Sequence, residues 1–256
     1  MCRNLGMMGP GISQTDLSII RDLGIISEMG GTDGAGIYQV KSHKYSPHTP
    51  SYELMYKSWS TWSQVVTNEI DNKQYGDLLS NTFVDVVIGH VRASTKGGIS
   101  DSNAHPFVFP NLVGVHNGTL KDQKYLHDKE KTDSELMFKD ISERGVEAVL
   151  TELDRDSAFA IVMYNKIDRK VYFARNELRP LSFAFIEDRA VMYWASEPGM
   201  LRFVLDRYGQ TYKVFNLKVN TVVKVYADNI STFKIKDDPL KIFEVHCKLD
   251  RQLPTH

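Results

Sequence analysis

The chain has 256 residues, and its 31 Lys and Arg residues nearly balance 32 Asp and Glu residues, giving a formal net charge of −1. This balance excludes a bulk electrostatic affinity for nucleic acid or for an anionic membrane, and we expect neither as a partner. Two cysteines are too few for a disulfide framework, and no apolar run reaches membrane-spanning length. The first residues contain no apolar stretch typical of a secretory signal, so we expect a cytoplasmic protein with reduced thiols.

In the N-terminal third, Ile19, Ile20, Leu23 and Ile26 lie at helical spacing and predict a helix. Its N-cap would be Ser13 or Thr15, and Gly30 and Gly31 would end it. The polar and aromatic segment 41–82 is expected to be an excursion between core elements. A nearly continuous β-branched run then predicts a buried strand over 84–91.

Strands dominate the rest of the chain, and the order of elements favours an α+β class with antiparallel sheets and helices outside them. We predict one domain over residues 1–235 and a peripheral tail over 236–256. The further predicted elements are a strand over 112–115, helices over 134–153, a hairpin of 158–164 and 170–174, a second hairpin of 181–186 and 190–195, a helix over 199–206 and weaker strands over 212–235.

Cys2 directly follows the initiator methionine, so removal of Met1 would leave a thiol and a free α-amine on one residue. An α-amine has a pKa of about 8, and much of it is neutral at cellular pH. It can therefore act as a local base for the adjacent thiol. A single cysteine at this position is, by itself, more often incidental.

Three further positions each have an ordinary structural interpretation and a chemical one. Arg92 follows a predicted strand and could form a structural ion pair or bind a carboxylate bidentately. Asn117 and Gly118 form a turn signal, or an oxyanion hole made by a side-chain amide and a backbone N–H. Asp133 precedes a predicted helix and could cap it or hold an ammonium group.

Together these features supply a nucleophile with its own base, a carboxylate clamp, an oxyanion hole and an ammonium acceptor. An α-amino acid with a reactive side-chain carbonyl satisfies all of them. Glutamine is the obvious candidate substrate.

With these features, the sequence resembles a class II glutamine amidotransferase domain of the N-terminal-nucleophile hydrolase type. The resemblance extends from Cys2 to about residue 201. It includes the stretches 31–37, 103–106, 174–181 and 195–197 in addition to the four features above. It implies a four-layer αββα sandwich, in which two stacked antiparallel sheets lie between helical layers.

The resemblance also implies a role for each site residue. Cys2 would be the nucleophile, and Asn117 with the Gly118 N–H would bind the oxyanion. Arg92, helped by Thr95, would bind the substrate α-carboxylate, while Asp133 would bind its α-ammonium group. The family motifs also contain His105 and His116, which we interpret as framework around the site. We expect no metal and no cofactor.

The implied activity is a glutaminase that hydrolyses the glutamine side-chain amide to glutamate and ammonia through a Cys2 thioester. Only about fifty residues follow the resembling region, so we expect a separate synthase or ligase to accept the ammonia. One alternative is a hydrolase of small γ-glutamyl amides without an acceptor. Another is a non-catalytic binding or assembly subunit that retains the fold.

Overall fold

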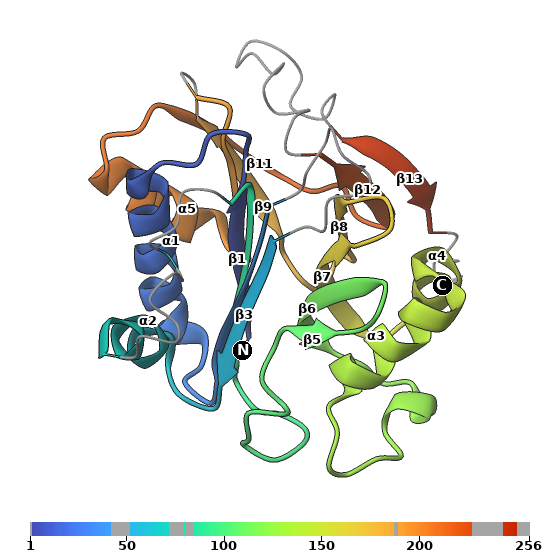
Figure 1. Cartoon of the computed structure of the whole chain (residues 1–256). Helices are drawn as coiled ribbons and strands as arrows, with labels where there is room; N and C mark the ends of the chain where they lie inside the picture. The colour runs from blue at the N-terminus through green and yellow to red at the C-terminus, as the bar shows by residue number, and fades with distance from the viewer. Residues whose placement is uncertain are drawn as a thin grey trace.

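Two antiparallel sheets lie face to face, and helices cover the outer side of each (Figure 1). This computed structural model describes residues 2–41, 52–71, 79, 84–186, 189–226 and 243–249. The arrangement confirms the predicted α+β class and the four-layer αββα order.

The first sheet has the strand order β11-β9-β10-β1-β4-β2-β3, and the second has the order β13-β12-β8-β7-β6-β5. The strands of the first sheet are β1 (Arg3–Met8), β2 (Ala35–Lys41), β3 (Tyr52–Ser58), β4 (Val86–Val91), β9 (Ser182–Ile186), β10 (Met192–Ala195) and β11 (Tyr212–Asn216). Those of the second are β5 (Phe107–Val108), β6 (Leu112–Thr119), β7 (Ala158–Asn165), β8 (Lys170–Arg175), β12 (Thr221–Val225) and β13 (Glu244–Lys248).

The helices divide into two layers according to the sheet that they cover. The first sheet is covered by α1 (Gln14–Ser27), which continues into the 3₁₀ turn η1 (Glu28–Gly30), and by α2 (Trp62–Asp71) and α5 (Pro198–Arg207). The second is covered by α3 (Asp133–Arg144) and α4 (Val146–Glu152), preceded by the 3₁₀ turn η2 (Gln123–Tyr125). Among the described helices, none is both long enough and apolar enough to cross a bilayer.

Helix α1 begins where the sequence predicts. Of the two candidate caps, Ser13 is the N-cap: its side chain accepts the N–H of Asp16, and the Asp16 carboxylate accepts the N–H of Ser13. This reciprocal pair satisfies two donors that a helix start leaves unpaired.

The segment 41–82 contributes more to the core than its sequence pattern indicates. Strand β3 pairs with β2 at the edge of the first sheet, and Trp62 at the start of α2 is fully buried. The Trp62 ring packs where Gly24 of α1 has no side chain, since a Cβ on Gly24 would lie 1.9 Å from that ring. Residues 42–51, 72–78 and 80–83 lie outside the described residues.

The predicted tail also contains a sheet element. Strand β13 pairs with β12 and forms one edge of the second sheet. The remaining tail positions, 236–242 and 250–256, lie outside the described residues. The division into a domain over 1–235 and a tail remains a prediction.

The side chains between the two sheets change from apolar to polar along the strands. In β1 and β4, Met8 and Ile88 point into an apolar cluster shared by both sheets. Because side chains alternate with a period of two, Asn4 and His90 lie on the same inward face of these strands. In β6, Val115 belongs to that apolar cluster, and Asn117 lies two residues further along. One end of this layer is therefore apolar and the other is polar.

Candidate active site

Cys2 lies at the polar end of the layer between the sheets, directly before β1. Its thiol, which is half-buried, donates to the carbonyl oxygen of Ala93, and the Ala93 N–H donates to the sulfur, both at 3.3 Å. Burial raises the pKa of the Cys2 thiol, while the Ala93 hydrogen bond and the charge of Arg92 lower it. The net effect favours the neutral thiol, so a thiolate needs a nearby base.

Arg92 extends the inward face of β4, and its side chain is only 2 % exposed. Its guanidinium donates to the carbonyl oxygens of Gly98 at 3.1 Å and Lys96 at 2.9 Å, and to the Ser94 hydroxyl at 3.3 Å. Burial lowers the pKa of Arg92, and the charges of Cys2, Asp33 and Asp133 oppose this effect. The guanidinium is therefore close enough to Cys2 and Asp133 to interact with their charges. It also holds the loop that follows β4 through its hydrogen bonds.

Thr95 lies in the same loop and was expected to help Arg92 bind the substrate α-carboxylate. In the structure Thr95 is exposed. A different residue anchors the loop to the site. The Asp33 carboxylate accepts the N–H of Ser94 at 2.8 Å, and the Asp33 N–H donates to the carbonyl oxygen of Arg92 at 3.0 Å.

Asn117 and Gly118 belong to strand β6, not to a turn, so the turn interpretation of this pair is wrong. Gly118 is required by close approach, since a Cβ would lie 1.9 Å from the carbonyl oxygen of Ala158. Opposite Gly118 on β7, the N–H and C=O of Phe159 both bond to Asn176. Gly118 and Phe159 thus form a non-hydrogen-bonded pair, and the Gly118 N–H points away from β7.

Asp133 is the first residue of α3 and is 5 % exposed. Thr132 is the helix N-cap, since its hydroxyl accepts the N–H of Glu135 at 3.1 Å. The Asp133 carboxylate instead accepts the N–H of Leu120, just beyond β6, and the N–H of Ser134, both at 2.8 Å. Asp133 therefore joins the start of α3 to the end of the strand that carries Asn117.

Three buried histidines, His90, His105 and His116, lie beside these groups. Burial lowers the pKa of His90 to about 3, that of His105 well below its usual range, and that of His116 as well. The His90 and His105 rings are in contact, with centroids 3.9 Å apart and planes tilted by 34°. His90 Nε2 lies 3.1 Å from the carbonyl oxygen of His116. These neutral rings pack and orient backbone, as expected for framework residues.

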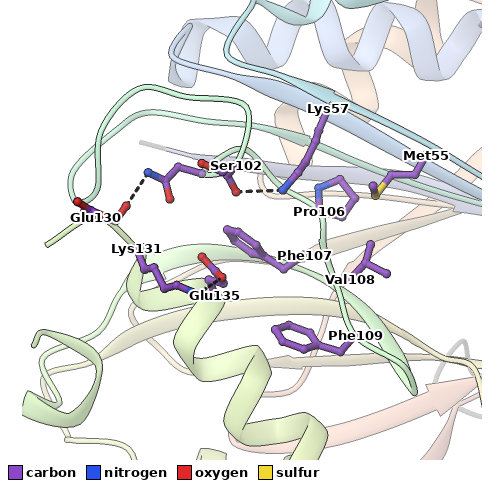
Figure 2. A pocket seen from close by; sticks show the side chains of 11 residues that line it. Met55, Lys57, Ser102, Pro106, Phe107, Val108, Phe109, Glu130, Lys131 and Glu135 are labelled. Atoms are coloured by element: carbon purple, nitrogen blue, oxygen red, sulfur yellow. Dashed lines mark hydrogen bonds and ion pairs between the residues drawn. The ribbon is translucent and has the colours of Figure 1, made fainter. Parts of the chain in front are cut away.

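A cavity of about 450 Å³ lies beside the loop after β4 (Figure 2). Its lining includes Lys57, Asn103 and Phe107 but not Cys2. The amide of Asn103 donates to the carbonyl oxygen of Gly98, which also accepts a bond from Arg92. The loop that Arg92 holds therefore also contributes Asn103 to the cavity wall. Among the described residues, no cluster of three or more His, Cys, Asp or Glu side chains is arranged to hold a metal ion.

Known proteins resemble the chain in segments of sequence and in fold. No protein-family model matches the chain. A segment of 100 residues is 29% identical to a Saccharomyces cerevisiae protein described as a probable glutamine amidotransferase. Another of 112 residues is 28% identical to the glutamine–fructose-6-phosphate aminotransferase of Sulfurisphaera tokodaii. The fold superimposes on glutamine phosphoribosylpyrophosphate amidotransferase from B. subtilis with a TM-score of 0.65 and 21% identity. In these segments and in its fold, the chain is similar to class II glutamine amidotransferase domains.

The amidotransferase domain matches only parts of its longer relatives. The alignment with the yeast protein covers 39% of this chain and 26% of that protein, and the archaeal alignment covers 36% and 19%. The structural match covers 89% of this chain and 48% of the B. subtilis enzyme. The chain thus corresponds to about half of that enzyme or less.

Two residues of the candidate site were missed by sequence reasoning. Asn4 lies on the same face of β1 as Cys2, a relation that the strand period would have revealed. Ser196 lies in a stretch that the resemblance included, but nothing local indicated a role. The structure shows the Ser196 hydroxyl accepting the N–H of Asn4 at 2.8 Å and lying 3.2 Å from the amide nitrogen of Asn117.

Proposed function

We propose that the chain is a glutaminase, which hydrolyses the side-chain amide of glutamine to glutamate and ammonia through a thioester on Cys2. This proposal rests on the closeness of four residues that are far apart in the sequence. Cys2, Arg92, Asn117 and Asp133 come from four different elements and gather at one end of the two sheets. Their chemistries match the thiol, carboxylate, oxyanion and ammonium requirements of the reaction.

The nucleophile and its base would be the two ends of one residue. Removal of Met1 would free the Cys2 α-amine, whose pKa of about 8 suits it to accept the thiol proton. Such a base is needed because burial raises the pKa of the Cys2 thiol and so favours its neutral form. As the C–S bond forms, the carbonyl becomes an oxyanion that the Asn117 amide and the Gly118 N–H would stabilise.

The second half of the reaction returns the proton. The tetrahedral intermediate collapses, the C–N bond breaks, and the α-ammonium group gives its proton to the departing nitrogen, so that ammonia leaves. Water then attacks the thioester, the C–S bond breaks, and glutamate and the free thiol are released. Atoms and charges balance without a cofactor.

Substrate binding would change the hydrogen-bond acceptors of the Arg92 guanidinium. In the structure its guanidinium donates to acceptors of the loop after β4. A substrate α-carboxylate would replace one of these acceptors with a charged, bidentate partner, which binds more strongly. Asp133 would supply the opposite charge for the α-ammonium group, while Thr95 would have to turn inward to contribute.

We further propose that the ammonia is passed to a separate partner enzyme. The relatives of this domain are longer, and their names describe amidotransferases and an aminotransferase. Glutamine hydrolysis at this site alone would release free ammonia, so an amination would need an acceptor site outside this domain. A rise in glutaminase activity on addition of a partner would support this assignment.

The test pairs intact-mass measurement of the purified chain with an assay of glutamate released from glutamine. We expect loss of Met1 and steady glutamate release. In Cys2→Ala the rate should fall by about four orders of magnitude or more, because the nucleophile is absent. Cys247→Ala is the matched control and should keep full activity, since Cys247 lies in edge strand β13.

Two other results would redirect the assignment. A processed chain that ignores glutamine but cleaves another γ-glutamyl amide, unaffected by partners, would be a simple hydrolase. A chain that retains Met1 and releases no glutamate from any such amide would be a binding or assembly subunit.

A further inference from the structure

The orientation of the Asn117 amide conflicts with the bonding capacity of its surroundings. Its nitrogen lies 3.2 Å from the Ser196 hydroxyl, so one of its two N–H groups is directed at a serine. Its oxygen is buried and has no hydrogen-bond partner among the described residues. Asn117 itself is 0 % exposed, and a buried carbonyl oxygen without a partner is unfavourable.

Ser196 has the bonding capacity to resolve this conflict. Its hydroxyl oxygen already accepts the N–H of Asn4 at 2.8 Å. A hydroxyl has one proton to donate and two acceptor positions, and its proton remains available for a better acceptor than the Asn4 carbonyl oxygen 3.5 Å away. Rotating the Asn117 amide by half a turn would place its oxygen opposite that proton.

We propose that Ser196 is the positioning residue of the oxyanion hole: its hydroxyl donates to the Asn117 side-chain oxygen and thereby turns the amide nitrogen toward the reacting carbonyl. This inference rests on the proposed glutaminase function. In this arrangement the buried Asn117 oxygen gains a donor. Both N–H groups of the amide are released from Ser196, and one can meet the oxyanion.

The backbone around Ser196 explains why this residue can fix the orientation. Its N–H donates to the carbonyl oxygen of Asn4 at 2.9 Å, and its hydroxyl accepts from the N–H of the same residue. Asn4 follows Cys2 by two positions and lies on the same strand face. Its amide nitrogen also donates to Ala160, the β7 residue opposite Asn117, at 2.9 Å. Ser196 thus ties the orientation of the oxyanion donor to the strand that carries the nucleophile.

Steady-state kinetics of Ser196→Ala on glutamine, with processed full-length protein, test the proposal. We expect kcat to fall by about tenfold to a hundredfold and KM to change by less than about twofold, because the oxyanion forms only in the transition state. Ser182→Ala is the matched control. Ser182 is a buried serine whose hydroxyl donates to the side-chain oxygen of Asn216 at 2.6 Å, so this variant loses the same kind of bond outside the site.

Two measurements separate orientation from general structural damage. In an Asn117→Ala background, Ser196→Ala should change kcat by less than about twofold, because the group it orients is gone. Alkylation of Cys2 by iodoacetamide proceeds without an oxyanion, so its rate should be unchanged in Ser196→Ala. If Ser196→Ala does not fold, Ser196→Cys, with a weaker donor, should show an intermediate kcat.

The possible outcomes test the positioning role of Ser196 separately from the proposed glutaminase function. Wild-type kcat in folded Ser196→Ala or Ser196→Cys would overturn the inference and leave the glutaminase intact. An equal loss with and without Asn117, or an equal loss in alkylation, would also overturn it by assigning Ser196 a merely structural role. A processed wild-type chain that releases no glutamate would remove the proposed function, and the inference with it.

Discussion

The two ends of the layer between the sheets are built from the same strands but differ in chemistry. Four strands, β1, β4, β6 and β10, carry inward side chains at both ends, with unbroken alternation between them. At one end these side chains are Met8, Ile88, Val115 and Trp194, and at the other they are Asn4, His90, Asn117 and, just beyond β10, Ser196. The comparison shows that a change of residue type along shared strands is what distinguishes the candidate site from the apolar core.

The two ends also differ in how they affect stability. The apolar end removes large side chains from water and stabilises the fold. The polar end buries amide oxygens of Asn4 and Asn117 that lack a partner among the described residues, and it holds neutral histidines. Such groups destabilise the folded state unless a ligand or a reoriented neighbour satisfies them. Substitutions at the two ends should therefore have separable effects.

Asn117→Ala should give the largest effect at the polar end among the substitutions that keep the nucleophile. We expect kcat on glutamine to fall by about a hundredfold to a thousandfold, equivalent to about 2.7–4 kcal/mol, because one oxyanion donor is lost. The free energy of unfolding should change little. Urea denaturation of the same preparation provides the control. An unchanged kcat would remove Asn117 from the mechanism.

Ile88→Ala should give the opposite pattern at the apolar end. Ile88 is fully buried between the sheets, and its truncation should lower the free energy of unfolding by about 2–5 kcal/mol. Below the unfolding transition, kcat and KM should stay within about twofold of wild type. A large loss of kcat in the folded variant would show that the two ends are coupled.

Sequence reasoning identified most of the polar end, and its failures have physical causes. Cys2, Arg92 and Asp133 could be singled out because reactive residue types follow recognisable strand or helix signals. Ser196 could not, because its partners lie 192 and 79 positions away in the chain. The packing partner of Trp62 could not be identified for a related reason, since the gap that accepts its ring is created by Gly24 on another helix. Long-range contacts of this kind leave no local pattern.

Asp133→Asn should weaken substrate binding with a smaller effect than loss of the oxyanion donor. The neutral amide keeps an acceptor for the N–H of Leu120 but loses the charge proposed to hold the substrate α-ammonium group. We expect KM to rise by about tenfold to a hundredfold, as for the loss of one charge-assisted hydrogen bond. Glutamate release at a series of glutamine concentrations measures this. As the control, Glu135→Gln two residues along α3 removes an exposed ion pair with Lys131 and should leave KM unchanged.

The pH dependence of stability should reveal the neutral histidines at the polar end. Burial holds the pKa of His90 at about 3 and lowers those of His105 and His116, whereas unfolded histidine titrates near about 6.5. Below that pH the unfolded chain binds protons that the folded chain does not. The free energy of unfolding should therefore be constant above about pH 7 and fall by about 1.4 kcal/mol per pH unit for each such ring at lower pH.

Urea denaturation between about pH 7.5 and pH 5.5 measures this slope before most carboxylates titrate. His90→Gln should reduce the slope by the contribution of about one proton, because the variant has no imidazole to protonate when it unfolds. His127→Gln, at an exposed position near η2, is the matched control and should leave the slope unchanged. A wild-type stability independent of pH over this range would mean that these rings bind protons in the folded state. The polar end would then carry positive charge close to Arg92, a condition that would favour the Cys2 thiolate and reduce its dependence on an adjacent base.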